Sequence, residues 1–165
     1  MFNPVSWFIG FPPELATFLL SALPLTELRA SIPIGIEIYK LPIWEVFLLA
    51  IAGNMAPVGL LLFFIPKLHQ YIIQRKLLGT LFTKLLNNAE KKFSGDFAKY
   101  GIIGLAVFVG IPLPMTGAWT GALAAFVFNI PFKKAFASIF AGVVMAGIAV
   151  TLITLSAGGV WRSIF

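Results

Sequence analysis

A carboxylate and a guanidinium stand close together in an otherwise apolar stretch near the start of the chain. Glu27 and Arg29 are two residues apart in the run PLTELRASIPIG, which Pro24 and Pro33 bound. Burial raises the pKa of a carboxyl group and a nearby guanidinium lowers it, so a movement that changes both could load and release a proton. Glu27 is therefore the candidate for proton coupling. The alternative is a permanent Glu27–Arg29 ion pair that pins the local structure.

A second polar interruption lies about ninety residues later, in the run PLPMTGAWTG that begins at Pro112 and contains Pro114. Hydroxyl and amide side chains in such places can orient a substrate or a coupling ion, or bond one helix to another. An indole offers a stacking wall for an organic cation or a lipid, and a planar guanidinium suits a phosphate. The candidate substrate-binding residues are Arg29, Asn54, Thr116, Gly117, Trp119 and Thr120.

The composition indicates an integral membrane protein. The 165 residues include 59% hydrophobic and 11% charged side chains, and the mean hydropathy is +0.97. Average proteins carry about 25% charged residues. An ionised side chain at membrane depth costs about 2.5–3.5 kcal/mol on insertion scales, so Glu27 and Arg29 are expected to be functional or closely paired.

Basic residues are concentrated in one segment. Seven of the twelve lysine and arginine residues lie between Lys67 and Lys99. Next to hydrophobic spans, this clustering is typical of a cytoplasmic loop that meets anionic lipid, so we expect no nucleic-acid partner. There is no cysteine, and His69 is the only histidine. Without a Ser–His, paired-aspartate or metal-ligand set, we expect no catalytic residues, no metal and no cofactor.

Two short helices with a polar break between them are predicted in the first half of the chain. The helix from Glu14 to about Leu23 and the helix over Leu28–Tyr39 are each too short for a hydrocarbon core about 30 Å thick. We interpret them as a re-entrant hairpin with its breaks at Pro24 and Pro33. One long kinked helix from Glu14 to Tyr39 is the alternative. A plain spanning helix is predicted over Ile43–Ile65.

The second half repeats this layout without charge. Residues 100–132 contain no charged side chain, and Pro112 and Pro114 divide them into the arms Gly101–Ile111 and Met115–Asn129. A spanning helix from Ala135 to about Gly158 should follow. Between the halves, apolar residues recur at helical spacing opposite basic ones. This pattern predicts amphipathic helices on the cytoplasmic membrane surface, or a helical hairpin packed against the transmembrane helices.

A shift of 89 residues superposes Pro42 on Pro131 and Gly53 on Gly142. Each hairpin leaves the membrane on the side it entered, so each unit crosses once and consecutive units must be inverted. Basic residues near the span ends place the linker in the cytoplasm and both termini outside. Inverted repeats with broken helices meeting near the membrane midplane are an architecture of secondary transporters.

The predicted fold is thus an all-α integral membrane protein, with an inverted repeat of a re-entrant helical hairpin plus a transmembrane helix and a cytoplasmic amphipathic helical linker. We expect one membrane domain (1–165) in the cell's plasma or inner membrane. Its parts are an interfacial segment (1–13), the first repeat (14–66), the basic linker (67–99) and the second repeat (100–159).

Two runs of the sequence are similar to those of a known family. ELRASIPIGIE and GIPLPMTGAWTGALAA, one from each half of the chain, resemble the signatures of the small multidrug export family. That family is similar in hairpin layout to the DedA (VTT) superfamily, and the resemblance covers roughly Leu23–Ala157. It implies export. DedA-type proteins imply proton-coupled transport and, for some, flipping of polyprenyl-phosphate lipids. Here the chain departs from the pattern, because its second hairpin lacks their charged residues.

Three function classes follow. The first is a proton-coupled exporter of small amphipathic molecules, and the second a translocase of polyprenyl phosphate or another anionic carrier lipid. The third is a membrane scaffold without a transported substrate. The expected partners are the lipid bilayer, protons and an amphipathic or lipid-phosphate substrate. Glycine and alanine faces also favour a homodimer.

Overall fold

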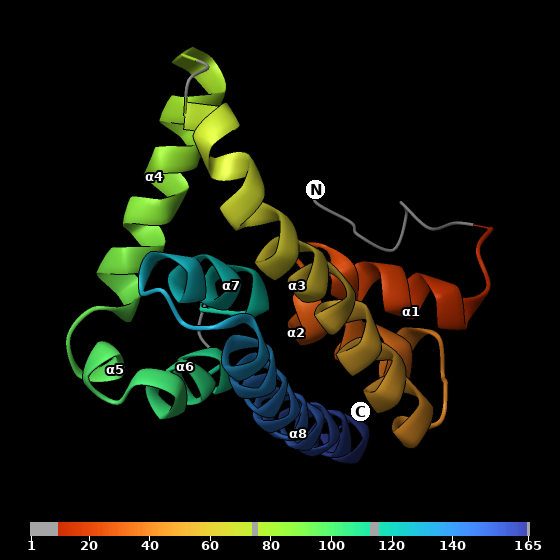
Figure 1. Ribbon diagram of the computed structural model, residues 1–165. Coiled ribbons are helices and arrows are strands. Elements are labelled where there is room, and N and C mark those ends of the chain that lie inside the picture. The colour runs from red at the N-terminus through yellow and green to blue at the C-terminus, as the bar shows by residue number, and fades with distance from the viewer. Residues whose placement is uncertain (1–9, 74–75, 113–115, 165) are drawn as a thin grey trace. The chain divides into compact units, whose positions relative to one another are not determined.

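The computed structural model describes residues 10–73, 76–112 and 116–164, and its regular elements there are helices (Figure 1). Pro114 and most of the predicted interfacial segment 1–13 lie outside the described residues. Two compact units make up the chain. The first unit comprises Met1–Ala56 and Val144–Phe165, and the second comprises Pro57–Val143.

The first unit opens with two short helices that pack against each other, α1 (Pro13–Ala22) and α2 (Glu27–Pro33) (Figure 1). Pro13 suits the first position of α1, since a proline there gives up no helical hydrogen bond. The helix ends at Leu23, whose φ of −78° and ψ of 141° are extended. A following proline drives the residue before it out of the helical region, so Pro24 explains this end.

Pro33, in contrast, does not break the second short helix. The chain passes through it from α2 directly into a π-helix, η2 (Ile34–Ile38). The Pro33 ring cannot donate a backbone hydrogen bond, and the wider turn of η2 follows it. The N–H of Tyr39 then donates to the carbonyl of Ile34 at 3.0 Å. Of the two prolines predicted at this break, only Pro24 therefore lies in the turn.

Two long apolar helices are able to cross a membrane, α3 (Ile43–Ile73) and α8 (Phe132–Ile164). Their apolar parts are 25 and 26 residues long, with mean hydropathies of 2.2 and 2.3. At 1.5 Å per residue either part is roughly 38 Å long, more than the hydrocarbon core of about 30 Å. Both helices begin within a few residues of their predicted starts.

α3 continues through Pro66, where the sequence pattern predicted its end. The reason is tertiary packing beyond the proline. The ring of His69 lies 6.0 Å from that of Phe82 and 5.1 Å from that of Phe126, measured between centroids. These contacts hold the end of α3 helical against two other helices and offset the hydrogen bond that Pro66 cannot make.

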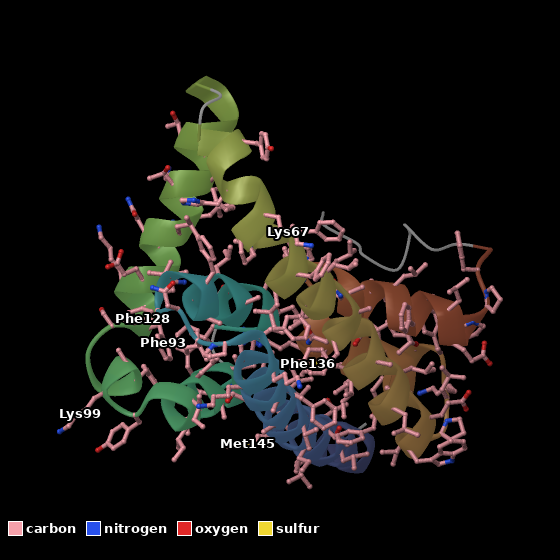
Figure 2. All side chains as sticks on the ribbon, in the orientation of Figure 1. Lys67, Phe93, Lys99, Phe128, Phe136 and Met145 are labelled. Atoms are coloured by element: carbon pink, nitrogen blue, oxygen red, sulfur yellow. The ribbon has the colours of Figure 1, made fainter. Side chains whose placement is uncertain are left out.

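The basic linker forms α4 (Lys76–Phe93) and the short α5 (Asp96–Lys99), and α4 packs on α7 (Ala118–Val127). The rings of Phe93 and Phe128 are packed edge to face with centroids 5.0 Å apart (Figure 2). Phe93 and Phe108 have the same geometry, with centroids 5.5 Å apart. Phe108 belongs to α6 (Gly101–Gly110). α4 thus packs on a short helix of the second unit, which leaves both predicted linker arrangements open.

Several local features recur after 89 residues. Lys40 and Asn129 both have a positive φ, 56° and 51°, which is uncommon for residues other than glycine. Two residues after each comes a proline, whose carbonyl accepts the N–H four residues on, at 3.0 Å in the first unit and 2.9 Å in the second. The same turn thus leads into α3 and into α8, which supports the 89-residue repeat.

Candidate functional site

Glu27 begins α2 in an unusual backbone conformation. Its φ is 48°, in the left-handed region, and its N–H donates to the carbonyl of Leu23 at 3.0 Å. The residue is 7% exposed. Its carboxylate lies 3.9 Å from the guanidinium of Arg29, which is itself largely buried. Non-glycine residues held at positive φ cost of order 1–3 kcal/mol and cluster at functional sites.

Three hydroxyl groups near this break are buried and satisfied. Thr17 donates to the carbonyl of Pro13 at 2.8 Å, within α1. Thr26 donates to the carbonyl of Leu20 and so ties the turn to α1. Ser21 donates across to the carbonyl of Ala50 on α3. These hydrogen bonds position the turn that carries Glu27.

Two buried polar side chains of the first unit differ from them. Ser31, one turn after Glu27, is 0% exposed, and Asn54 on α3 is 1% exposed. No described atom makes a hydrogen bond to Ser31 Oγ or to Asn54 Oδ1. Leaving a buried polar atom unsatisfied costs roughly 1–3 kcal/mol. Such atoms are candidates for contact with a bound molecule.

The second break has a polar but uncharged turn. Ile111 is extended, with φ of −75° and ψ of 120°, because Pro112 follows it. Thr116 Oγ1 donates to the Ile111 carbonyl at 3.1 Å. The Gly117 carbonyl accepts the N–H of Gly121 at 2.9 Å and starts α7.

Trp119 and Thr120 lie in the first turn of α7 and are partly exposed. They leave an indole face and a hydroxyl near the second break, where the sequence placed them. The predicted site residues thus fall into two groups. Glu27, Arg29 and Asn54 belong to the first unit, whereas Thr116 to Thr120 belong to the second.

Sequence reasoning singled out Glu27 and Arg29 by their charge, but it did not place Ser31 in the site. A serine in an apolar helix is common, and only its burial without a partner distinguishes it. The signal available was its spacing, because residues four apart in a helix share a face and Ser31 follows Glu27 by four. Among the described residues, no group of three or more His, Cys, Asp or Glu side chains is placed to hold a metal ion.

Two apolar helices long enough to cross a membrane indicate an all-helical membrane protein. The family model described as "Putative small multi-drug export protein" matches residues 27–149, about three quarters of the chain. The chain belongs to this family, which confirms the resemblance found in the sequence. The family is described by export and not by an enzymatic activity. No curated protein and no solved structure matches the chain.

Proposed function

We propose that the protein is a secondary transporter that exports small amphipathic cations in exchange for protons, with Glu27 as the proton carrier. The burial of Glu27 at the break between α1 and α2 carries this proposal. A carboxylate there is costly to keep charged, and its neighbourhood changes if the two short helices move. Membership of an export family supports the direction of transport.

The proposed layout is an inverted repeat of two re-entrant hairpins. α1 has ten residues, roughly 15 Å, so it reaches only about half-way through a hydrocarbon core. α6 and α7 also have ten residues each. The features that recur after 89 residues support the repeat. If each repeat crosses the membrane once, the two repeats must be inverted. The basic linker is then cytoplasmic and both chain ends are outside.

The second hairpin carries further candidate substrate-binding residues. Thr116 and Thr120 offer hydroxyls for hydrogen bonds, and Gly117 allows close approach to the start of α7. Trp119 offers an aromatic face, which attracts organic cations by roughly 0.5–2 kcal/mol. Since this hairpin lacks charge, proton coupling in the proposed mechanism depends on the first one.

The direct test is reconstitution of the full chain into vesicles that contain a pH-sensitive dye. Addition of the benzamidinium cation outside vesicles with an acidic lumen should speed the loss of lumenal protons, because each cation that enters exchanges for a proton. Benzamidine is a strong base that stays charged at neutral pH, so it crosses lipid slowly without the protein. Protein-free vesicles provide the baseline. Equal rates with and without protein, for every amphipathic cation tried, would reject the exporter and leave the lipid translocase and the scaffold.

A second candidate, translocation of an anionic carrier lipid, is favoured by one observation. Arg29 is largely buried beside the first break, and a guanidinium binds a phosphate through two parallel hydrogen bonds. We expect Arg29→Ala to keep the cation-driven proton movement, and the wild type to leave a labelled polyprenyl phosphate in its original leaflet.

The lipid candidate makes the opposite prediction. The wild type would then move the labelled lipid, and Arg29→Ala would slow this by tenfold or more, since hydrogen bonds to charged groups contribute about 1.5–3 kcal/mol. Arg29→Lys is the matched variant. It keeps the charge but loses the planar fork, so partial activity would show that phosphate recognition uses the guanidinium itself.

A further inference from the structure

Ser31 and Asn54, the two buried side chains whose oxygen atoms have no hydrogen-bond partner among the described residues, lie on α2 and α3 of the first unit. The packing of Gly35 shows how these helices face each other. A Cβ at Gly35 would lie 2.8 Å from Val46 Cγ1 on α3 and 3.4 Å from Thr17 Cγ2 on α1. This side of the second short helix therefore faces both α1 and α3.

Ser31 is four residues before Gly35, about one turn across the junction of α2 with the wider η2, and it is fully buried, so it also faces the interior of the unit. One turn after Thr17 in α1 comes Ser21, and one turn after Val46 in α3 comes Ala50. The Ser21 hydroxyl donates to the Ala50 carbonyl, which shows that α1 and α3 advance together over this turn. Ser31 is thus at the level of this hydrogen bond.

One more turn in the same direction leads from Ser31 to Glu27 in α2 and from Ala50 to Asn54 in α3. Glu27 is four residues before Ser31, and Asn54 is four residues after Ala50. Only residues 39–42 connect η2 to α3. With Gly35 opposite Val46, so short a connection implies that the two helices run in opposite directions, and both steps then lead the same way along the unit. This register places Glu27, Ser31 and Asn54 near one another among the buried residues of the first unit.

All three side chains can accept hydrogen bonds. Asn54 Oδ1 only accepts, a carboxylate offers about four lone-pair sites, and a hydroxyl offers two. We propose that these acceptors bind the positively charged head of the exported molecule through its N–H groups. Glu27 supplies the charge, while Ser31 Oγ and Asn54 Oδ1 supply directional hydrogen bonds. The Glu27 carboxylate also forms an ion pair with Arg29 at 3.9 Å, so in this proposal the ligand shares the carboxylate with the guanidinium.

The substrate class follows from this chemistry. Primary amines, amidines and guanidines have N–H donors that satisfy both neutral oxygens, whereas quaternary ammonium ions have none and would leave them unpaired. A site built to hydrogen-bond its ligand rejects analogues that lack the matching group. This inference rests on the proposed function and names the substrate of the same site.

At the matching positions of the second unit, one of the three residues is not an acceptor. The shift of 89 residues puts Thr116, Thr120 and Val143 at the matching positions. Val143 is 0% exposed on α8, so a valine can fill a buried helix position of this kind. Asn54→Val is therefore a suitable test, because it removes the acceptor and keeps a side chain that the second unit already uses.

The experiment compares two aromatic cations of similar size by titration calorimetry on the full chain in detergent. Benzamidinium has N–H donors, and benzyltrimethylammonium has none. The wild type should bind benzamidinium at least about tenfold more tightly. Asn54→Val and Ser31→Ala should each weaken benzamidinium binding about ten- to hundredfold, the loss expected for one hydrogen bond to a charged group. Neither should change the affinity for benzyltrimethylammonium more than about threefold.

The unfolding temperature of Asn54→Val distinguishes a ligand-binding role of Asn54 from a structural one. Without ligand, Asn54→Val removes an unsatisfied buried oxygen, so the unfolding temperature should stay equal or rise by about 2–4 °C. A structural hydrogen bond would instead be lost, and the temperature would fall. Thr151→Val is the matched control, since Thr151 is buried and donates to the Gly147 carbonyl of its own helix at 2.8 Å. It should leave both affinities unchanged.

Two results would overturn the proposal. Equal affinity of the wild type for the two cations would show that N–H donors are not recognised. Competition by Na⁺, but not by K⁺, against benzamidinium would show that the oxygens hold a metal cation. Neither result contradicts the proposed export function, which is rejected only if no cation drives proton movement in vesicles. Equal proton movement with both cations would keep the exporter and reject this substrate class.

Discussion

Glu27→Gln is expected to reduce substrate-driven proton movement in proteoliposomes to the level of protein-free vesicles. The amide has nearly the same shape as the carboxylate and can still accept a hydrogen bond, but it cannot take up or release a proton. The effect is large because the second hairpin has no charged residue to take over this role. The measurement is the dye signal after addition of benzamidinium, with the amount of folded protein matched by its thermal unfolding curve.

Glu37, ten residues after Glu27, provides a matched control. Glu37 forms a pair with Lys40 at 3.5 Å, and both side chains are much more exposed than that of Glu27. Exposed pairs contribute about 0–1 kcal/mol, so Glu37→Gln should transport like the wild type. Glu27→Asp keeps a titratable group on a shorter side chain and should retain part of the activity. Normal proton movement by Glu27→Gln would show that Glu27 is a structural partner of Arg29 and not the carrier.

The helix ends that depend on local chemistry could be predicted from the sequence. Leu23 and Ile111 both precede a proline, and both are extended in the structure. The two apolar helices begin directly after Pro42 and Pro131, which is the predicted start of α3 and three residues before the predicted start of α8 at Ala135. In each case the steric restriction acts on an adjacent residue, so distant parts of the chain need not be known.

Pro33 and Pro66 could not be placed in the same way. Both lie inside continuous helical segments, although a proline removes one helical hydrogen bond. A wider π-helical turn follows Pro33, and packing contacts follow Pro66. The ring contacts of His69 with α4 and α7 are an example. These contacts join residues far apart in the sequence, and no local pattern announces them.

The candidate site also contains residues that the sequence reveals and one that only the structure reveals. A charge in an apolar run is visible in the sequence, so Glu27 and Arg29 could be chosen from their residue types alone. Ser31 could not, because its significance lies in burial without a partner. The structure adds the close approach of Gly35 to Val46 and the hydrogen bond from Ser21 to Ala50, from which the proximity of the site residues is inferred.

Gly53→Ala is expected to destabilise the protein by about 1–3 kcal/mol or more, the usual cost of overpacking. Gly53 lies in α3, where an added Cβ would collide with the backbone carbonyl oxygen of Phe18 and come within 3.1 Å of Ser21 Cβ. The backbone of α1 must then move, since a carbonyl cannot rotate away as a side chain can. For a chain of this length, the unfolding temperature in detergent should fall by roughly 2–12 °C.

The repeat makes a second, parallel prediction. Gly142 lies 89 residues after Gly53, and a Cβ there would come within 2.5 Å of the Ala106 carbonyl oxygen on α6. In both units, then, the long helix packs closely against the backbone of a short helix at one glycine, and the two glycines are 89 residues apart. Gly142→Ala should therefore lower the unfolding temperature by a similar amount. A large effect at one glycine and none at the other would argue against equivalent packing in the two units.

Gly59→Ala separates this steric effect from helix propensity. Gly59 is also in α3, but the nearest atom to an added Cβ is Phe136 Cε2 at 3.8 Å, an ordinary contact. Alanine is favoured over glycine in a helix by about 0.8–1 kcal/mol, so this variant should be as stable as the wild type or more stable. Gly53→Ala and Gly59→Ala make the same chemical change six residues apart in one helix. Opposite signs would identify close approach of α1 as the reason for glycine at position 53, whereas equal stability of the two variants would contradict it.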